Sequence, residues 1–176
     1  MVTVPTQILK ELSEAYGVSG NEDDVRSIVL HAIRDHVDEV SVDALGNLLT
    51  VKHGTDQDSM RVMLAAHMDE IGLMVVDHDD EGLLKVRAVG GIDARLLPGT
   101  LLVVGPDKIP GVIGIKPIHL VESKKTDKVV KIEDLRVDIG AKRKEEAQEL
   151  APLGTYATFA TQYRELGPTV TGKAFD

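Results

Sequence analysis

The amino-acid sequence predicts an α/β domain whose chain is interrupted by an inserted all-β domain. Two observations support this prediction. Helical and hairpin patterns fill residues 1–70, whereas short β-like segments separated by Gly and Pro turns fill residues 71–162. The remaining residues, 163–176, are then expected to return to the first domain. Because 43% of the 176 residues are hydrophobic, the chain can bury a core.

The first 70 residues contain two helical patterns followed by strand patterns. Apolar residues fall on one helical face within 5–16, and a second stripe with helical spacing lies within 25–37. Residues 40–42 and 48–51 flank a turn and predict a β-hairpin. The run 61–66 is almost continuously apolar, which predicts a central strand covered on both faces.

The second part of the chain is rich in short strand patterns. Turn signals of Gly, Pro and Asp separate several of these patterns, as is typical of a small barrel or sandwich. One helix, 142–150, interrupts them, and the charged stretch 122–131 is expected to be a loop. The predicted strands are 71–76, 83–89, 100–104, 109–115, 136–139 and 156–160.

Composition excludes several classes of function. The chain has 29 acidic and 20 basic residues, and this net charge of −9 has the wrong sign for binding a phosphate backbone, so we expect no nucleic-acid partner. It contains no cysteine, so any metal must bind to His, Asp or Glu. No apolar run approaches the ~18 residues that a membrane span needs, and we expect a cytoplasmic protein without a membrane partner.

His67 and Asp69 form the most informative chemical motif, because an imidazole and a carboxylate follow an apolar strand pattern where that pattern ends. Side chains two residues apart leave an extended backbone on the same side, so the carboxylate can orient the imidazole while the imidazole binds a metal. A polar strand end that turns into solvent would show the same pattern. Asp176 is unremarkable when it is considered alone, and no GxSxG motif supports a serine hydrolase.

Five separated blocks of sequence resemble, in order and spacing, the tetrahedral, or glutamyl/deblocking, family of dinuclear metallo-aminopeptidases. The resemblance covers the whole chain, and five blocks together are more specific than any one of them. The blocks are 17–20 (GVSG), 65–75 (AAHMDEIGLMV), 89–93 (VGGID), 137–141 (VDIGA) with 145–147 (EEA), and 173–176 (KAFD).

This resemblance implies an aminopeptidase-type α/β catalytic domain that carries an inserted β-barrel. It further implies self-association through the barrel into a hollow twelve-subunit tetrahedron, and removal of amino-terminal residues from peptide substrates. By the resemblance His67 would bind one of two divalent metal ions, zinc or cobalt, and Asp69 would be the catalytic-site carboxylate that steers its ring. Asp176 would bridge the two metals.

The sequence departs from the family in one respect. Family members continue for about as long again, and the paired glutamates, the further Asp and the final His of their metal site have no counterpart in these 176 residues. We therefore expect the 176 residues alone to be inactive and to bind metal weakly or not at all. Two alternatives stay open: a non-catalytic oligomerisation module, and a sibling metal-dependent hydrolase such as a carboxypeptidase or a glycan-directed enzyme.

Overall fold

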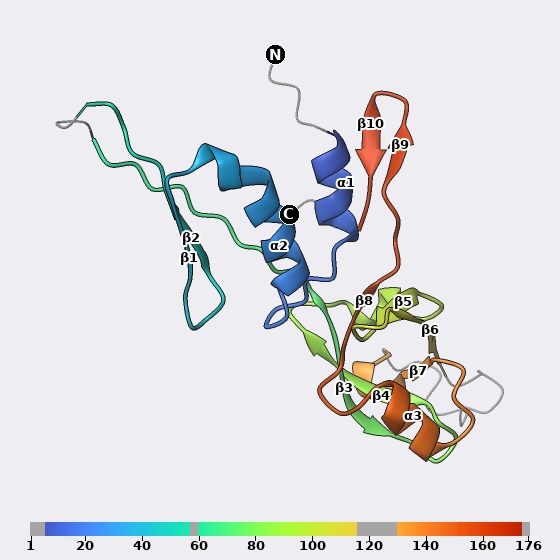
Figure 1. Ribbon diagram of the computed structural model, residues 1–176. Coiled ribbons are helices and arrows are strands. Elements are labelled where there is room, and N and C mark those ends of the chain that lie inside the picture. Colours follow the sequence, from blue (N-terminus) through green and yellow to red (C-terminus); the bar gives the residue numbers. More distant parts are fainter. Residues whose placement is uncertain (1–5, 57–59, 116–129, 174–176) are drawn as a thin grey trace.

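The computed structural model describes residues 6–56, 60–115 and 130–173. Within these residues the chain forms a helical part with two hairpins and, next to it, a β-barrel (Figure 1). Asp176 and most of the predicted loop 122–131 lie outside the described residues.

The helical part begins with the two helices and the hairpin that the sequence predicts. The hairpin turn is held by the carboxylate of Asp43, which accepts the backbone N–H groups of Leu45 and Asn47 at 2.9 Å each. The elements are α1 (Thr6–Glu14), α2 (Asp23–Ile33), a 3-10 turn (Arg34–His36), β1 (Glu39–Val42) and β2 (Leu48–Val51).

The prediction of a central strand at 61–66 is wrong for the described chain. These residues pair with no strand among the described residues, and the side chains of Val62, Met63 and Leu64 are 73%, 86% and 93% exposed. The physical reason is that an apolar run becomes a β-strand only when neighbouring strands satisfy its N–H and C=O groups. Local sequence supplies the apolar side chains but not these neighbours.

A groove of about 970 Å³ runs along the helical part. Apolar side chains of α1, α2, β1 and β2 line it together with residues 63–70. In agreement with this open side, α2, β1 and β2, all of which are described, contain no buried residue. The α/β domain that the sequence predicts is therefore present only in part among the described residues.

The second part of the chain is a closed antiparallel barrel, which decides between the barrel and the sandwich that the sequence allowed. Its strands follow each other around the barrel in the order β3-β4-β7-β6-β5-β8, so β3 and β8, the first and last barrel strands in the sequence, are neighbours. The strands are β3 (Gly72–His78), β4 (Leu84–Val89), β5 (Leu101–Val104), β6 (Ile109–Gly114), β7 (Arg136–Asp138) and β8 (Tyr156–Phe159). Short 3-10 turns precede β5 and β7, at Ala94–Leu96 and Ile132–Asp134.

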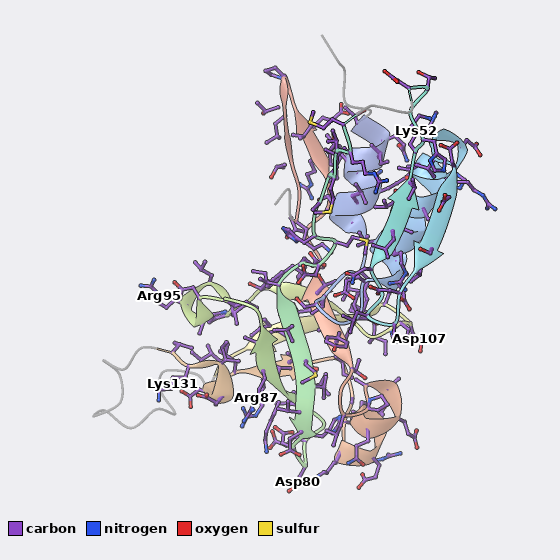
Figure 2. All side chains as sticks on the ribbon, turned by 90° about the vertical axis from the view of Figure 1, so that its left-hand side faces the viewer. Lys52, Asp80, Arg87, Arg95, Asp107 and Lys131 are labelled. Carbon is purple, nitrogen blue, oxygen red and sulfur yellow. The ribbon has the colours of Figure 1, made fainter. Side chains whose placement is uncertain are left out.

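The barrel core forms because alternate residues of each strand point inward. In β3, for example, Leu73 and Val75 are buried, whereas Val76, which lies at a β-bulge between Val75 and Asp77, is 36% exposed. The tip of the β3–β4 hairpin, marked by Asp80, lies at the opposite end of the molecule from Lys52, which follows β2 (Figure 2). The fully buried aliphatic side chains of the barrel are Leu73, Val75, Leu84, Leu97, Leu102, Val104, Ile113, Leu135 and Val137.

Helix α3 (Lys144–Leu150) covers one side of the barrel through small side chains. Ala147 and Ala151 are fully buried against the core. The imidazole of His78, which is also buried, makes a hydrogen bond from Nε2 to the carbonyl oxygen of Ala151 at 2.7 Å. This histidine is therefore a satisfied core residue that joins β3 to the end of α3.

After the barrel the chain returns to α1. Strands β9 (Arg164–Leu166) and β10 (Thr169–Thr171) form a short hairpin. The backbone N–H of Tyr163 donates to Glu14 at 3.0 Å, and the backbone N–H of Lys173 donates to Ser13 at 3.1 Å. These bonds hold the return segment against the last turn of the first helix (Figure 1). Among the described residues, no helix has the length and apolar character needed to cross a membrane.

We expect substitutions in the two apolar regions to differ sharply in cost. Leu73→Ala should lower the free energy of unfolding by about 2–5 kcal/mol, because this side chain is fully buried in the barrel. Leu64→Ala should lower it by less than about 0.5 kcal/mol, because the Leu64 side chain is 93% exposed. Urea titration of both variants checks this, and equal losses would show that the segment 61–66 packs in solution.

Candidate functional site

His67 and Asp69 lie in contact at the end of the exposed apolar segment, just before the barrel. The Nδ1 atom of His67 is 3.1 Å from Oδ1 of Asp69 and 3.1 Å from its backbone oxygen. Because both neighbours of Nδ1 are hydrogen-bond acceptors, the proton belongs on Nδ1 and the lone pair remains on Nε2. The side chains are 56% and 39% exposed, so the imidazole is accessible to a ligand from solvent.

The carboxylate of Asp69 is itself held by Ser19, which lies in the connection between α1 and α2. The Ser19 hydroxyl donates to Oδ2 of Asp69. This hydrogen bond lowers the pKa of Asp69 below its ordinary value, and the contact with His67 lowers it further. Asp69 is therefore ionised over the neutral range and can orient the imidazole of His67.

The backbone around Asp69 is tied to the same connection. The N–H of Glu70 donates to the carbonyl of Gly17 at 2.8 Å, and the N–H of Ser19 donates to the carbonyl of Glu70 at 3.3 Å, which forms a parallel bridge. Gly72 follows where the backbones crowd together. A Cβ atom on Gly72 would lie 2.4 Å from Val18 and 2.8 Å from the carbonyl oxygen of Ala157. Only glycine allows this approach.

A buried cluster around Lys173 joins the two parts of the molecule beside this site. The ammonium of Lys173 donates to Oε1 of Glu70 at 2.6 Å, to Oγ1 of Thr158 at 3.2 Å and to the carbonyl of Ala15. The Thr158 hydroxyl in turn donates to Oε1 of Glu70 at 2.6 Å. The Lys173 and Glu70 side chains are only 3% and 12% exposed. All three ammonium protons therefore have acceptors, as a buried charge requires.

The sequence blocks that resemble the family include Ser19, Glu70 and Lys173, but the sequence predicted no individual role for them. It predicted no role for Thr158. One signal for Glu70 was present, namely a second carboxylate beside Asp69. No signal in the sequence could pair Glu70 with Lys173, because 103 residues separate them. The contact arises only when the barrel closes and brings β8 and the return segment back to residue 70.

The described residues fit one part of a metal site. His67 offers the Nε2 lone pair of an oriented imidazole, which is a donor suited to a divalent transition metal. In residues 6–56, 60–115 and 130–173, no three His, Asp or Glu side chains converge so that they could hold a metal ion. Asp176, the third predicted site residue, lies outside these residues.

Comparison with known proteins shows which family the chain is similar to. A sequence profile described as M42 glutamyl aminopeptidase matches residues 46–176. The chain belongs to the M42 glutamyl aminopeptidase family. This matches the family that the five sequence blocks indicate.

Three relatives illustrate the M42 likeness. The lysyl aminopeptidase of Pyrococcus furiosus is 36% identical over 93% of this chain and 48% of its own length. The TET1 peptidase of Pyrococcus horikoshii, described as assembling into a tetrahedron or an octahedral shell, is 39% identical with a TM-score of 0.81 over 96% of this chain and 51% of its own. A Thermotoga maritima structure described as an endoglucanase is 37% identical with a TM-score of 0.82, over 96% and 49%.

These matches cover most of this chain but only part of each relative. The chain spans about half the length of the curated relatives it matches. Within this chain, the match to the M42 family extends over the barrel and over residues before and after it.

We expect Ser19→Ala to raise the pKa of Asp69 toward its ordinary value, because the hydroxyl that stabilises the carboxylate is lost. The folded-state pKa of Asp69 lies below the unfolded one. Its contribution to stability is thus present above the unfolded pKa and is lost as the pH falls through the folded pKa. Stability of the variant should depend less on pH in the acid range.

Carboxyl-carbon NMR titration of the wild type and the variant measures this pKa. Ser27→Ala is the matched control, because the Ser27 hydroxyl donates to the backbone carbonyl of Asp23 rather than to a carboxylate. An unchanged Asp69 titration in Ser19→Ala would contradict the assigned hydrogen bond.

Proposed function

We propose that this chain forms the amino-terminal half of a metal-dependent aminopeptidase that removes amino-terminal residues from peptides. The observation that carries the proposal is the imidazole of His67, which is oriented by Asp69 and leaves Nε2 available, in a member of the M42 family. The lysyl aminopeptidase from P. furiosus, with 36% identity across this region, supports the same substrate class.

In this proposal His67 and Asp176 hold metal, and Asp69 keeps the His67 ring in the tautomer and orientation that binding needs. Two divalent ions, zinc or cobalt, would supply Lewis-acid polarisation of the peptide carbonyl and an activated water. Ser19 keeps Asp69 charged, so that the Nδ1 proton of His67 stays fixed in place. No further ligand is assigned among the described residues.

The proposal assigns the remaining ligands to sequence beyond these 176 residues. The length of the relatives, about twice that of this chain, supports this assignment. The apolar groove of about 970 Å³ and the exposed segment 61–66 also support it, because both present surfaces that further strands would cover. We therefore propose that the 176-residue chain alone is inactive and binds zinc weakly.

Two alternatives have specific observations in their favour. The T. maritima relative is described as an endoglucanase, which favours a glycan-directed hydrolase. Against this, the chain has only three Tyr and two Phe and no Trp, so it offers few stacking surfaces for sugar rings. A non-catalytic assembly module is favoured by the barrel, which forms a closed core of its own.

We further propose that the barrel mediates self-association, alongside the catalytic role. An apolar patch formed by Leu101 and Val112 on its outer surface supports this, and Leu96 in the 3-10 turn before β5 is also exposed. Leu101 and Val112 are direct partners across β5 and β6, and the side chains of Leu96, Leu101 and Val112 are 76%, 63% and 37% exposed. The occupant would be a second copy of the chain, as the shells formed by the P. horikoshii relative suggest.

The enzymatic proposal predicts activity of the complete polypeptide and inactivity of the 176-residue chain. The complete protein should release residues from peptides with a free amino terminus, spare amino-acetylated peptides and lose activity to a chelator. Asp69→Asn should lower activity by roughly 10–100-fold, because the ring of His67 loses its charged partner. Equal cleavage of acetylated peptides, or hydrolysis of a soluble β-glucan instead of peptides, would reject the proposal.

The assembly proposal predicts that Leu101→Asp shifts the protein toward the monomer in analytical ultracentrifugation, because a charge would be buried at the contact between copies. Leu166→Asp is the matched control. Leu166 is 58% exposed but lies in the β9–β10 hairpin, outside the barrel. A monomeric wild type, or equal effects of the two substitutions, would count against the patch.

A further inference from the structure

The buried pair of Lys173 and Glu70 is close in the sequence to two of the proposed metal ligands. His67 is three residues before Glu70, and Asp176 is three residues after Lys173 in the sequence. The 2.6 Å contact between Nζ of Lys173 and Oε1 of Glu70 therefore ties residue 173 to the segment that carries His67 and Asp69.

The acceptors around the ammonium come from three different places in the chain and select lysine. Besides Glu70, they are the carbonyl of Ala15 after α1 and the hydroxyl of Thr158 in β8. Separately, the backbone N–H of Lys173 donates to the hydroxyl of Ser13. A compact ammonium matches three acceptors converging on one point, whereas a planar guanidinium would not. The position of residue 173 is thus fixed by both its backbone and its side chain.

Glu70 passes this constraint on to Asp69. Its backbone N–H and carbonyl are both hydrogen-bonded to the segment 17–19, through the carbonyl of Gly17 and the N–H of Ser19. The hydroxyl of the same Ser19 holds the Asp69 carboxylate, which in turn contacts His67. A shift of Glu70 after loss of its ionic partner would therefore disturb the group that orients the imidazole.

We propose that Lys173 and Glu70 are positioning residues, which hold the Asp69 carboxylate, and through it the His67 imidazole, in the orientation that metal binding needs. The inference rests on the proposed function, since it takes His67 as a metal ligand. Neither Lys173 nor Glu70 is assigned as a ligand. A purely structural role would also lower stability on substitution, so the test must measure metal binding rather than stability alone.

The main test measures zinc affinity of the complete polypeptide by competition with a chromophoric chelator. Lys173→Met should weaken zinc binding roughly 10–100-fold, the range seen when the groups that orient metal ligands are lost. It should also lower kcat while KM stays within about threefold, since substrate contacts are untouched. Lys85→Met is the matched control, because Lys85 and Asp77 are also 2.6 Å apart but are 37% and 50% exposed on the barrel.

A second set of variants keeps the inference testable if Lys173→Met does not fold. Thr158→Val keeps the shape of the side chain and removes one acceptor of the ammonium, and Glu70→Gln keeps the shape and removes the charge. Both should weaken zinc binding in the same direction, with Thr158→Val the milder. Thermal melting confirms that the variants compared are folded.

A rescue experiment uses the absence of cysteine from the 176-residue chain. Lys173→Cys can be alkylated in denaturant with bromoethylamine, which restores an ammonium of nearly the same reach, or with iodoacetamide, which adds a neutral group. After refolding, amide hydrogen exchange at Ser19 and Glu70 should regain wild-type protection only in the aminoethylated protein. Equal protection after both treatments would show that the ammonium does not order these residues, and would overturn the proposal.

The outcomes separate the two proposals. If the complete wild-type protein shows no zinc-dependent peptide cleavage, the proposed function is wrong, whatever the variants do. If the wild type binds zinc and cleaves peptides but Lys173→Met, Glu70→Gln and Thr158→Val bind zinc as tightly, the positioning inference is wrong and the pair only stabilises the fold. Zinc binding weakened in these variants and unchanged in Lys85→Met supports the inference.

Discussion

The described structure depends on the hydrogen bonds of the buried Lys173 ammonium group, which lies where the helical part meets the barrel. Moving an ion out of water costs several kcal/mol, and only a complete set of acceptors offsets that cost. Here the acceptors belong to Ala15, Glu70 and Thr158, so the cluster is favourable only when the end of the first helix, the start of the barrel and its last strand are all in place. A pair of aliphatic side chains could bury as much surface, but it would tolerate several arrangements.

The two parts on either side of this cluster differ in how they satisfy their apolar faces. The barrel closes on itself, and its strands supply both the hydrogen-bond partners and the buried side chains of the core. The helical part has apolar faces along an open groove, with no buried residue in α2. His67 and Asp69 lie at the boundary, just before the barrel, and line the open groove.

The features that could be predicted from sequence are those set by neighbours along the chain. The barrel strands follow from alternation and turn residues, and the contact of His67 with Asp69 follows from a spacing of two in extended backbone. The strand expected at 61–66 was wrong because β-structure needs partners that a local pattern does not contain. The pairing of Glu70 with Lys173 could not be predicted for the same reason, because the sequence around either residue does not indicate the other. The roles of His67, Asp69 and Asp176 as site residues remain predictions.

The adjacency of β3 and β8 has a consequence for the genetics of this protein. The chain leaves the helical part at Gly72 and comes back at Phe159, and these strands are paired through Leu73 with Ala157. A module whose two ends emerge together can be spliced into a host, shortened to a tight turn or exchanged for another module without rerouting the host chain. Recombination could thus alter the barrel and leave in place Glu70 and Lys173, which join it to the helical part.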